Sequence, residues 1–207
     1  MNGPLAPPGA GTTAGFVLAG GKSLRMGRDK ALLPLGPDGR TMIEHAAICV
    51  RLAAGSVTII GNREIYGHIG LLGIDFPVIA DLIPDCGPMG GLYTILKTTT
   101  AAWNLVTACD MPNLSAEFLR NLLLTAVESE ADCVIPKGLD AGLHPLCAAY
   151  HQSCLPEVER LIAGKCFTMH RLIDNLQAEH WFVSDNRLLA NVNSPVDVVL
   201  ATGTKTE

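Results

Sequence analysis

The chain has 207 residues, of which 48% are hydrophobic and 17% charged, and its formal net charge at pH 7 is −5. This length suits one domain with a sizeable core, and the hydrophobic fraction excludes general disorder. An acidic chain of this kind does not have the excess of Lys and Arg that is typical of nucleic-acid-binding proteins. No apolar run is long enough to span a membrane.

The two ends of the chain differ in composition from the region between them. Residues 1–13 are rich in Pro and Gly and hold no Lys, Arg or apolar block, so we predict a flexible tail rather than a secretory signal. A single domain is predicted over residues 14–201, followed by a short C-terminal tail at 202–207. The chain has 7 cysteines, an odd number, with no Cys-x-x-Cys pair. This pattern favours reduced thiols in a cytoplasmic protein over disulfides or a zinc site.

Short apolar runs alternate with helical patterns along the predicted domain. Several runs are continuously apolar rather than alternating, which is typical of strands buried on both faces of a helix-covered sheet. The predicted strands are Gly15–Ala19, Ser56–Ile60, Pro77–Ala80, Asn104–Ala108, Asp132–Ile135, Leu146–Tyr150 and His180–Val183.

Helical patterns occupy the intervals between these strands. Ser115 is an expected N-cap, and Pro156 suits a first helical turn because its missing N–H has no partner there. The predicted helices are Thr41–Leu52, Met89–Lys97, Ser115–Val127, Pro156–Ile162 and Ser194–Leu200. The alternation predicts an α/β three-layer sandwich with a Rossmann-like, mainly parallel sheet. Ligands bind beyond the carboxyl ends of the strands in such sheets, so the loops that leave the strands are the candidate sites.

The first of these loops combines glycines with cations. Gly20 and Gly21 directly follow the strand Gly15–Ala19 and allow backbone N–H groups to face an anion. A cluster of cations follows them, made up of Lys22, Arg25, Arg28 and Lys30. In an acidic chain this combination predicts a polyphosphate site.

Other types of loop fit this segment less well. A Walker A loop needs a glycine at position 16, which is Phe16. The dinucleotide-binding pattern G-x-G-x-x-G cannot be placed here. A solvated basic loop would explain the cations but not the two glycines.

The same segment resembles the opening of the molybdenum cofactor guanylyltransferases, which are sugar-nucleotide-type nucleotidyltransferases. The family pattern L-A-G-G-x-S/A-x-R-M-G-x-D-K is met at Leu18, Ala19, Gly20, Gly21, Arg25, Met26, Gly27, Asp29 and Lys30. The resemblance implies a nucleotide bound by residues 18–21 and by Lys30. It also implies that Arg25 and Lys30 are catalytic cations, which neutralise the triphosphate and the leaving pyrophosphate.

A second glycine-rich segment runs from Asp81 to Gly91. Gly87-Pro88 predicts a turn, and the glycines that open the next helix let a flat group approach the backbone, although an ordinary turn before a helix is the alternative. The segment resembles the family's D-x(5)-G-P-L-A-G motif, which wraps the guanine base and the ribose. This resemblance implies nucleotide contacts by Asp81, Gly87, Gly90 and Gly91. Asn62 matches the family's N-R pair, and we expect it to contact the nucleotide as well.

Asp110 follows the most apolar strand, where a carboxylate is costly without a partner. Mg²⁺ is a suitable partner because it prefers one or two carboxylates together with phosphate oxygens. The alternative is an Asp that caps the turn before Pro112. The family carries C-D-x-P here, which implies that Asp110 is a catalytic residue, a nucleotide contact and the Mg²⁺ ligand.

Three later residues also match family motifs. His144 resembles the family's His-Pro strand start, and Asn191 and Asn193 resemble its N-x-N-T-P ending. His144 and Asn191 are thus candidates for the pterin side, and Asn193 for a second metal ligand. A structural histidine and helix capping by the asparagines are the alternatives. Ile60, in contrast, stands where many members carry a polar residue.

The resemblance implies transfer of GMP from GTP to the phosphate of molybdopterin or Mo-molybdopterin, with Mg²⁺ as cofactor and pyrophosphate as the second product. A related transferase that uses CTP or a sugar phosphate, and a non-catalytic nucleotide-binding regulator, are the alternative hypotheses. The resemblance further implies exchange with a molybdenum-insertion protein and apo-molybdoenzymes. We expect a cytoplasmic monomer or weak homo-oligomer that binds neither nucleic acid nor membranes.

Overall fold

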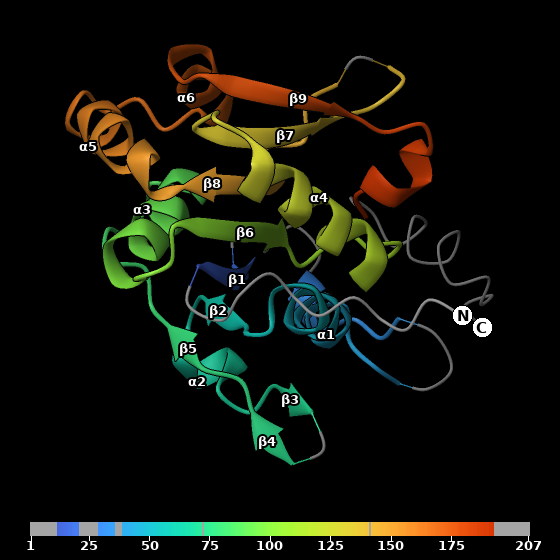
Figure 1. Ribbon diagram of the computed structural model, residues 1–207. Coiled ribbons are helices and arrows are strands. Elements are labelled where there is room, and N and C mark those ends of the chain that lie inside the picture. Colours follow the sequence, from blue (N-terminus) through green and yellow to red (C-terminus); the bar gives the residue numbers. More distant parts are fainter. Residues whose placement is uncertain (1–11, 21–28, 36–38, 72, 141, 193–207) are drawn as a thin grey trace.

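A seven-stranded sheet covered by helices on both faces forms the body of the protein, with a small two-stranded hairpin at one end (Figure 1). The computed structural model describes residues 12–20, 29–35, 39–71, 73–140 and 142–192. The predicted three-layer α/β architecture is confirmed. The predicted last helix, Ser194–Leu200, and the C-terminal tail lie outside the described residues.

All seven predicted strands are present, with their ends shifted by a few residues, and their order across the sheet is β5-β2-β1-β6-β8-β7-β9. They are β1 (Thr13–Leu18), β2 (Thr58–Ile60), β5 (Val78–Ile79), β6 (Trp103–Ala108), β7 (Cys133–Lys137), β8 (Cys147–His151) and β9 (Ala178–Phe182). β8 is antiparallel to its neighbours β6 and β7, and the other pairs of this sheet are parallel. The sheet is therefore mainly parallel, as predicted, with one reversed strand.

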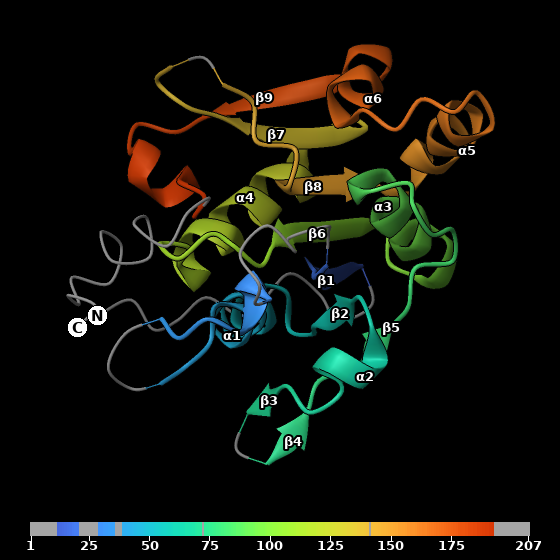
Figure 2. The same ribbon diagram turned by 180° about the vertical axis from the view of Figure 1, so that it is seen from behind.

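Neighbouring residues of each central strand enter opposite cores, which explains the continuous apolar runs in the sequence. Val17 and Leu105 pack with α1 and α4, while Phe16 and Val106 pack with α3, α5 and α6. Figures 1 and 2 show these two helical layers on opposite faces of the sheet. The helices are α1 (Met42–Ala54), α3 (Pro88–Thr98), α4 (Ala116–Glu128), α5 (Leu155–Ala163) and α6 (Met169–Asn175).

The long helices begin where the sequence supplies a cap. Thr41 and Glu44 form a reciprocal capping box at the start of α1, in which the Glu44 N–H donates to Thr41 Oγ1 (3.3 Å) and the Thr41 N–H to Glu44 Oε2 (2.7 Å). The Ser115 hydroxyl caps α4 as predicted, by accepting the Phe118 N–H at 3.1 Å. None of the helices within the described ranges has the length and apolar character needed to cross a bilayer.

The elements that the sequence did not predict are mostly short. Four residues form α2 (Arg63–Tyr66), and two-residue strands form the hairpin of β3 (Gly70–Leu71) and β4 (Ile74–Asp75). Such segments hold too few residues to show a periodic pattern. The helix α6 was not predicted, because its 7 residues span too few turns to show a clear periodic pattern. The remaining elements are 3-10 turns, namely η2 (Lys30–Leu32), η3 (Gln152–Cys154) and η4 (Asn186–Leu189).

Gly15 allows β1 and α1 to pack closely, and Gly15→Ala is expected to destabilise the protein. A β-carbon at this position would overlap Val50 Cγ1 and lie 2.6 Å from the Ser56 carbonyl oxygen. Overpacking of this kind costs about 1–3 kcal/mol, so the thermal midpoint should fall by several degrees. Gly164→Ala is the control, because its β-carbon would make ordinary contacts of 3.5 Å. Equal midpoints for the two variants in thermal denaturation would contradict this prediction.

Candidate active site

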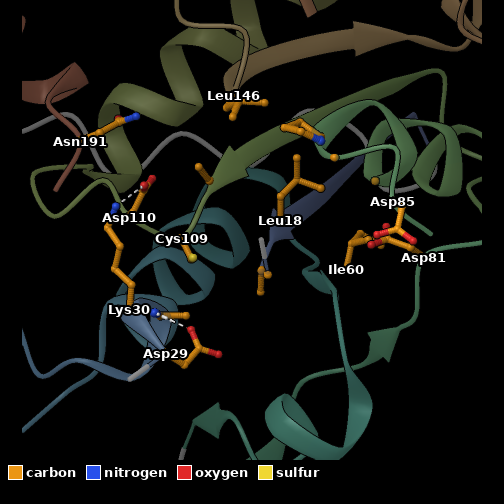
Figure 3. A pocket seen from close by; sticks show the side chains of 17 residues that line it. Leu18, Asp29, Lys30, Ile60, Asp81, Asp85, Cys109, Asp110, Leu146 and Asn191 are labelled. Atoms are coloured by element: carbon orange, nitrogen blue, oxygen red, sulfur yellow. Dashed lines mark hydrogen bonds and ion pairs between the residues drawn. The ribbon is translucent and has the colours of Figure 1, made fainter. Parts of the chain in front are cut away.

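A cavity of about 610 Å³ lies at the carboxyl ends of β1, β2 and β6. The turn η2 and the start of α3 complete its walls (Figure 3). Its lining consists of Leu18, Ala19, Gly20, Asp29, Lys30, Ala31, Ile60, Asp81, Asp85, Gly87, Pro88, Gly91, Ala108, Cys109, Asp110, Leu146 and Asn191. The cavity thus occupies the ligand-binding edge expected of an open α/β sheet.

Lys30 and Asp110 meet at one end of this cavity (Figure 3). Lys30 Nζ donates to Asp110 Oδ2 at 2.9 Å, although the two residues are 80 positions apart in the chain. Their side chains are only 13% and 22% exposed, so the ion pair is largely shielded from solvent. A cation and a carboxylate that were predicted to serve one triphosphate therefore lie in direct contact.

The second oxygen of Asp110 is suited to bind a metal ion. Asp110 Oδ1 is buried and has no hydrogen-bond partner among the residues that the structure describes. An unpartnered carboxylate oxygen in a shielded position favours a bound cation. No group of three or more His, Cys, Asp or Glu side chains suitable for a metal ion occurs within the described ranges. A single free carboxylate oxygen is compatible with Mg²⁺, which takes one or two protein carboxylates and completes its shell with phosphate and water oxygens.

Backbone hydrogen bonds hold the loop that carries Asp110. The Cys109 N–H donates to the Leu18 carbonyl (3.2 Å) and the Ala108 N–H to the Leu146 carbonyl (2.6 Å). The Val192 N–H donates to the Asp110 carbonyl at 2.9 Å, which brings the segment containing Asn191 to the same end of the cavity. Segments from three distant parts of the chain therefore fix the position of the carboxylate.

Cys109 lines the cavity but is not suited to act as a nucleophile. Burial, together with the neighbouring Asp110 charge, raises the pKa of the Cys109 thiol to about 12. The thiolate is the reactive form of cysteine, and it is scarcely populated near neutral pH with this pKa. Covalent chemistry at this side chain is therefore disfavoured.

The opposite end of the cavity is built from Asp81 and the start of α3 (Figure 3). Burial raises the pKa of the Asp81 carboxyl. A β-carbon on Gly91 would lie 2.7 Å from Leu18 Cδ2 and 3.7 Å from Asp81 Oδ1, so glycine keeps this wall open. Gly87 caps α3 with a φ of 57°, a left-handed conformation that favours glycine. A flat group can approach the backbone between these residues.

Most of the described candidate residues lie together in the cavity lining, and three do not. Asn62 caps α2, where its Oδ1 accepts the Glu64 N–H at 2.8 Å. Gly90 faces the preceding loop, since its β-carbon would lie 2.7 Å from the Ile83 carbonyl oxygen. His144 lies two residues before the lining residue Leu146, and burial lowers its pKa.

Several predicted residues cannot be located. Gly21, Arg25 and Asn193 lie outside the described residues, as do the cations Lys22 and Arg28. Their assigned roles in phosphate or metal binding stay predictions.

The structure also places residues in the lining that sequence reasoning gave no role. Asp29 belongs to the opening motif and lines the cavity, yet it was assigned no function, unlike its neighbour Lys30. Asp85 adopts a φ of 62°, which is unusual for a residue other than glycine. Asp85 lies four positions after Asp81. This spacing would place the two side chains on one face of a helix, but it predicts nothing about their positions in a loop. The position of Leu146 directly before β8 was the only available clue to its place in the lining.

Comparisons with known proteins identify the family of the chain. Residues 15–180 match the MobA-like NTP transferase domain. The chain is 33% identical over 195 residues to a probable molybdenum cofactor guanylyltransferase of Carboxydothermus hydrogenoformans, covering 87% of this chain and 90% of the relative. It is 35% identical over 190 residues to the protein of the same name from Mycobacterium tuberculosis, covering 87% and 89%.

A solved structure shares the fold. The molybdopterin-guanine dinucleotide biosynthesis protein A of Archaeoglobus fulgidus superposes with a TM-score of 0.74 at 24% identity, covering 92% of this chain and 97% of that one. Domain match, sequence identity and fold are mutually consistent. The chain therefore belongs to the family of MobA-like NTP transferases.

Proposed function

We propose that the protein is a molybdenum cofactor guanylyltransferase, which transfers GMP from GTP to the terminal phosphate of molybdopterin or Mo-molybdopterin. The observation that carries this proposal is the Lys30–Asp110 pair, with its unpartnered buried Oδ1, at the end of a nucleotide-sized cavity. The names of the relatives favour GTP and molybdopterin as the two substrates.

In this proposal the cavity binds GTP lengthwise. The triphosphate faces Lys30, whose ammonium neutralises the oxygens of the pyrophosphate that leaves. The main chain at Gly20 holds the phosphates, and the base and ribose lie near Asp81, Gly87 and Gly91. Lys30 is the only cation in the described lining, and its place at one end of the cavity favours a single orientation of the nucleotide.

The chemical step requires positioning and charge neutralisation more than proton transfer. An oxygen of the acceptor phosphate bonds to the α-phosphorus, while the bond from that phosphorus to the bridging oxygen of pyrophosphate breaks, and pyrophosphate leaves with the electron pair. An ionised phosphate needs little help from a general base. Asp110 would hold Mg²⁺ through Oδ1, and the ion would supply Lewis-acid polarisation of the phosphate oxygens.

The direct test incubates the full chain with GTP, MgCl₂ and molybdopterin and measures pyrophosphate release. We expect release that depends on all three components. Pyrophosphate formed only with a sugar phosphate would favour the related transferase. GTP binding without turnover of any acceptor would favour the non-catalytic regulator.

Nucleotide choice is a separate prediction. With molybdopterin as acceptor, we expect GTP to be used in preference to CTP and ATP, because the segment from Asp81 to Gly91 resembles the guanine-binding motif. Competition at equal nucleotide concentrations, with the dinucleotide products separated by chromatography, measures this preference. A product mixture dominated by the cytosine dinucleotide would move the protein to the cytidylyl-transferring relatives.

In the cell, we propose that this reaction takes place in the cytoplasm. The remaining partners would be the molybdenum-insertion protein and the apo-molybdoenzymes that receive the cofactor. His144, Asn191 and Asn193 remain the candidates for contacts on the pterin and metal side, and of these Asn191 lines the cavity.

A further inference from the structure

Asp29 directly precedes Lys30, and both oxygens of its carboxylate are engaged. Oδ1 accepts the Ala31 N–H at 3.0 Å, which caps the turn η2 and fixes the backbone on either side of Lys30. Oδ2 accepts the phenol O–H of Tyr66 at 2.6 Å. Asp29 therefore connects the backbone around Lys30 to a residue 37 positions further along the chain.

Tyr66 is itself held firmly. It is 2% exposed, and its backbone N–H donates to the Asn62 carbonyl at 2.9 Å. Its ring lies over Gly61, where a β-carbon would be 2.9 Å from Cδ2 and Cε2 of the ring. The Gly61 N–H donates to the Ile79 carbonyl of β5 at 2.9 Å. The phenol oxygen is thus fixed relative to the parallel half of the sheet.

We propose that Tyr66 is a positioning residue that acts through Asp29 to hold Lys30 at the phosphate end of the cavity. This inference rests on the proposed function, because it assigns Lys30 to the triphosphate. The contacts run without interruption from the sheet through Gly61 and Tyr66 to Asp29 and then along the backbone to Lys30. Of these four residues, only Lys30 was assigned a role from the sequence.

The phenol hydrogen bond also fixes the orientation of the Asp29 carboxylate. Asp29 lines the cavity next to Lys30, so a free carboxylate there would repel a triphosphate and compete with it for the ammonium (Figure 3). Burial, followed by the Asp29 hydrogen bond, raises the pKa of Tyr66, so the phenol remains a donor throughout the physiological pH range. Without that donor, Asp29 Oδ2 would be free to turn toward Lys30.

Tyr66→Phe tests the inference because it removes the hydroxyl and keeps the ring over Gly61. We expect kcat/KM for GTP to fall about tenfold, the range of one hydrogen bond to a charged group, with a thermal midpoint close to that of the unmodified protein. Asp29→Ala should lose at least as much activity. Asp29→Asn should restore most of it, since an amide can accept the Ala31 N–H and donate to the phenol oxygen.

A double-mutant cycle separates positioning from a general structural role. In a Lys30→Gln background, Tyr66→Phe should have little further effect on kcat/KM, because both changes act on the same group. Effects that multiply independently would overturn the inference, as would unchanged kcat/KM in Tyr66→Phe alone. Tyr93→Phe is the control, since this half-buried tyrosine lies on α3 beneath Lys97 and does not line the cavity.

A spectroscopic measurement makes the test independent of turnover. With ¹³C-labelled lysine, the ε-methylene signal of Lys30 is assigned by its absence in Lys30→Gln. We expect this signal to shift in Tyr66→Phe and to stay in place in Tyr93→Phe. If the unmodified protein releases no pyrophosphate while the signal shifts as expected, the proposed function fails and the positioning contact stands. An unmoved signal in Tyr66→Phe overturns the positioning contact whatever the activity.

Discussion

Asp110→Asn is expected to lower the rate of pyrophosphate release on the order of 100-fold or more, the size expected for removing one preorganised charge from such a site. The amide is isosteric and can still accept from Lys30, so the fold and the position of the loop should be kept. What is lost is the anionic Oδ1, the buried atom best suited to a metal ion. The measurement is the initial rate at saturating Mg²⁺, with circular dichroism to check the fold.

The same substitution, which lowers the rate of pyrophosphate release, should leave metal-free GTP binding unchanged or make it tighter. In the absence of metal, removing a carboxylate near the triphosphate reduces repulsion, so a fluorescent GTP analogue should bind Asp110→Asn as well as or better than the unmodified protein. Glu159→Gln is the matched control, because Glu159 also accepts from a lysine (3.1 Å) but lies on α5, outside the cavity. Full activity of Asp110→Asn would remove this residue from the site.

Lys30→Ala should also lower turnover on the order of 100-fold, but with a different binding signature. The ammonium is the only cation in the described cavity lining, so metal-free binding of the GTP analogue should weaken by about tenfold or more. Opposite changes in metal-free binding for the Lys30 and Asp110 variants would separate phosphate neutralisation from metal binding. Equal changes of the same sign would indicate that the ion pair acts only as a structural unit.

Two further variants keep the Lys30 experiment interpretable. Lys30→Gln preserves a donor to Asp110 and guards against loss of the fold when Ala leaves the carboxylate unpaired. Lys97→Ala removes an ion-paired lysine from α3, outside the cavity, and should leave both turnover and GTP binding unchanged. A defect in Lys97→Ala equal to that in Lys30→Ala would point to net charge rather than to the site.

The sequence predicted those parts of the fold that depend on local composition. The central strands were recognisable because both of their faces are buried. The helix that begins after Thr41 was recognisable from its apolar pattern, and the helix that begins after Ser115 from its expected cap. The reversal of β8 was not predictable, because an apolar run such as Cys147–Tyr150 reads the same in either strand direction. Only the pairing with neighbouring strands determines that direction.

The site divides in a similar way. Lys30 and Asp110 were predicted because each follows a strand within a dense motif, and parallel strands bring such exits to one edge. Tyr66 was not predicted, since a tyrosine in a four-residue helix has no pattern that links it to Asp29. Asn62 was expected to contact the nucleotide, but its side chain caps α2, a use for which asparagine is equally suited.

The reversed strand β8 has a consequence for how this enzyme family can diversify. Because β8 runs against β6 and β7, the connection between Lys137 and Cys147 emerges at the same edge as Asp110. In the proposed function the donor nucleotide lies at the carboxyl ends of β1, β2 and β6, whereas this connection joins β7 to β8 in the other half of the sheet. In the proposed function, changes in the part of the connection that precedes Leu146 would reshape the acceptor side and leave the donor side in place, because Leu146 itself holds the Asp110 loop. The half of the sheet that carries the cavity could thus keep its triphosphate chemistry, while the half that carries β8, β7 and β9 is adapted to a different phosphorylated acceptor.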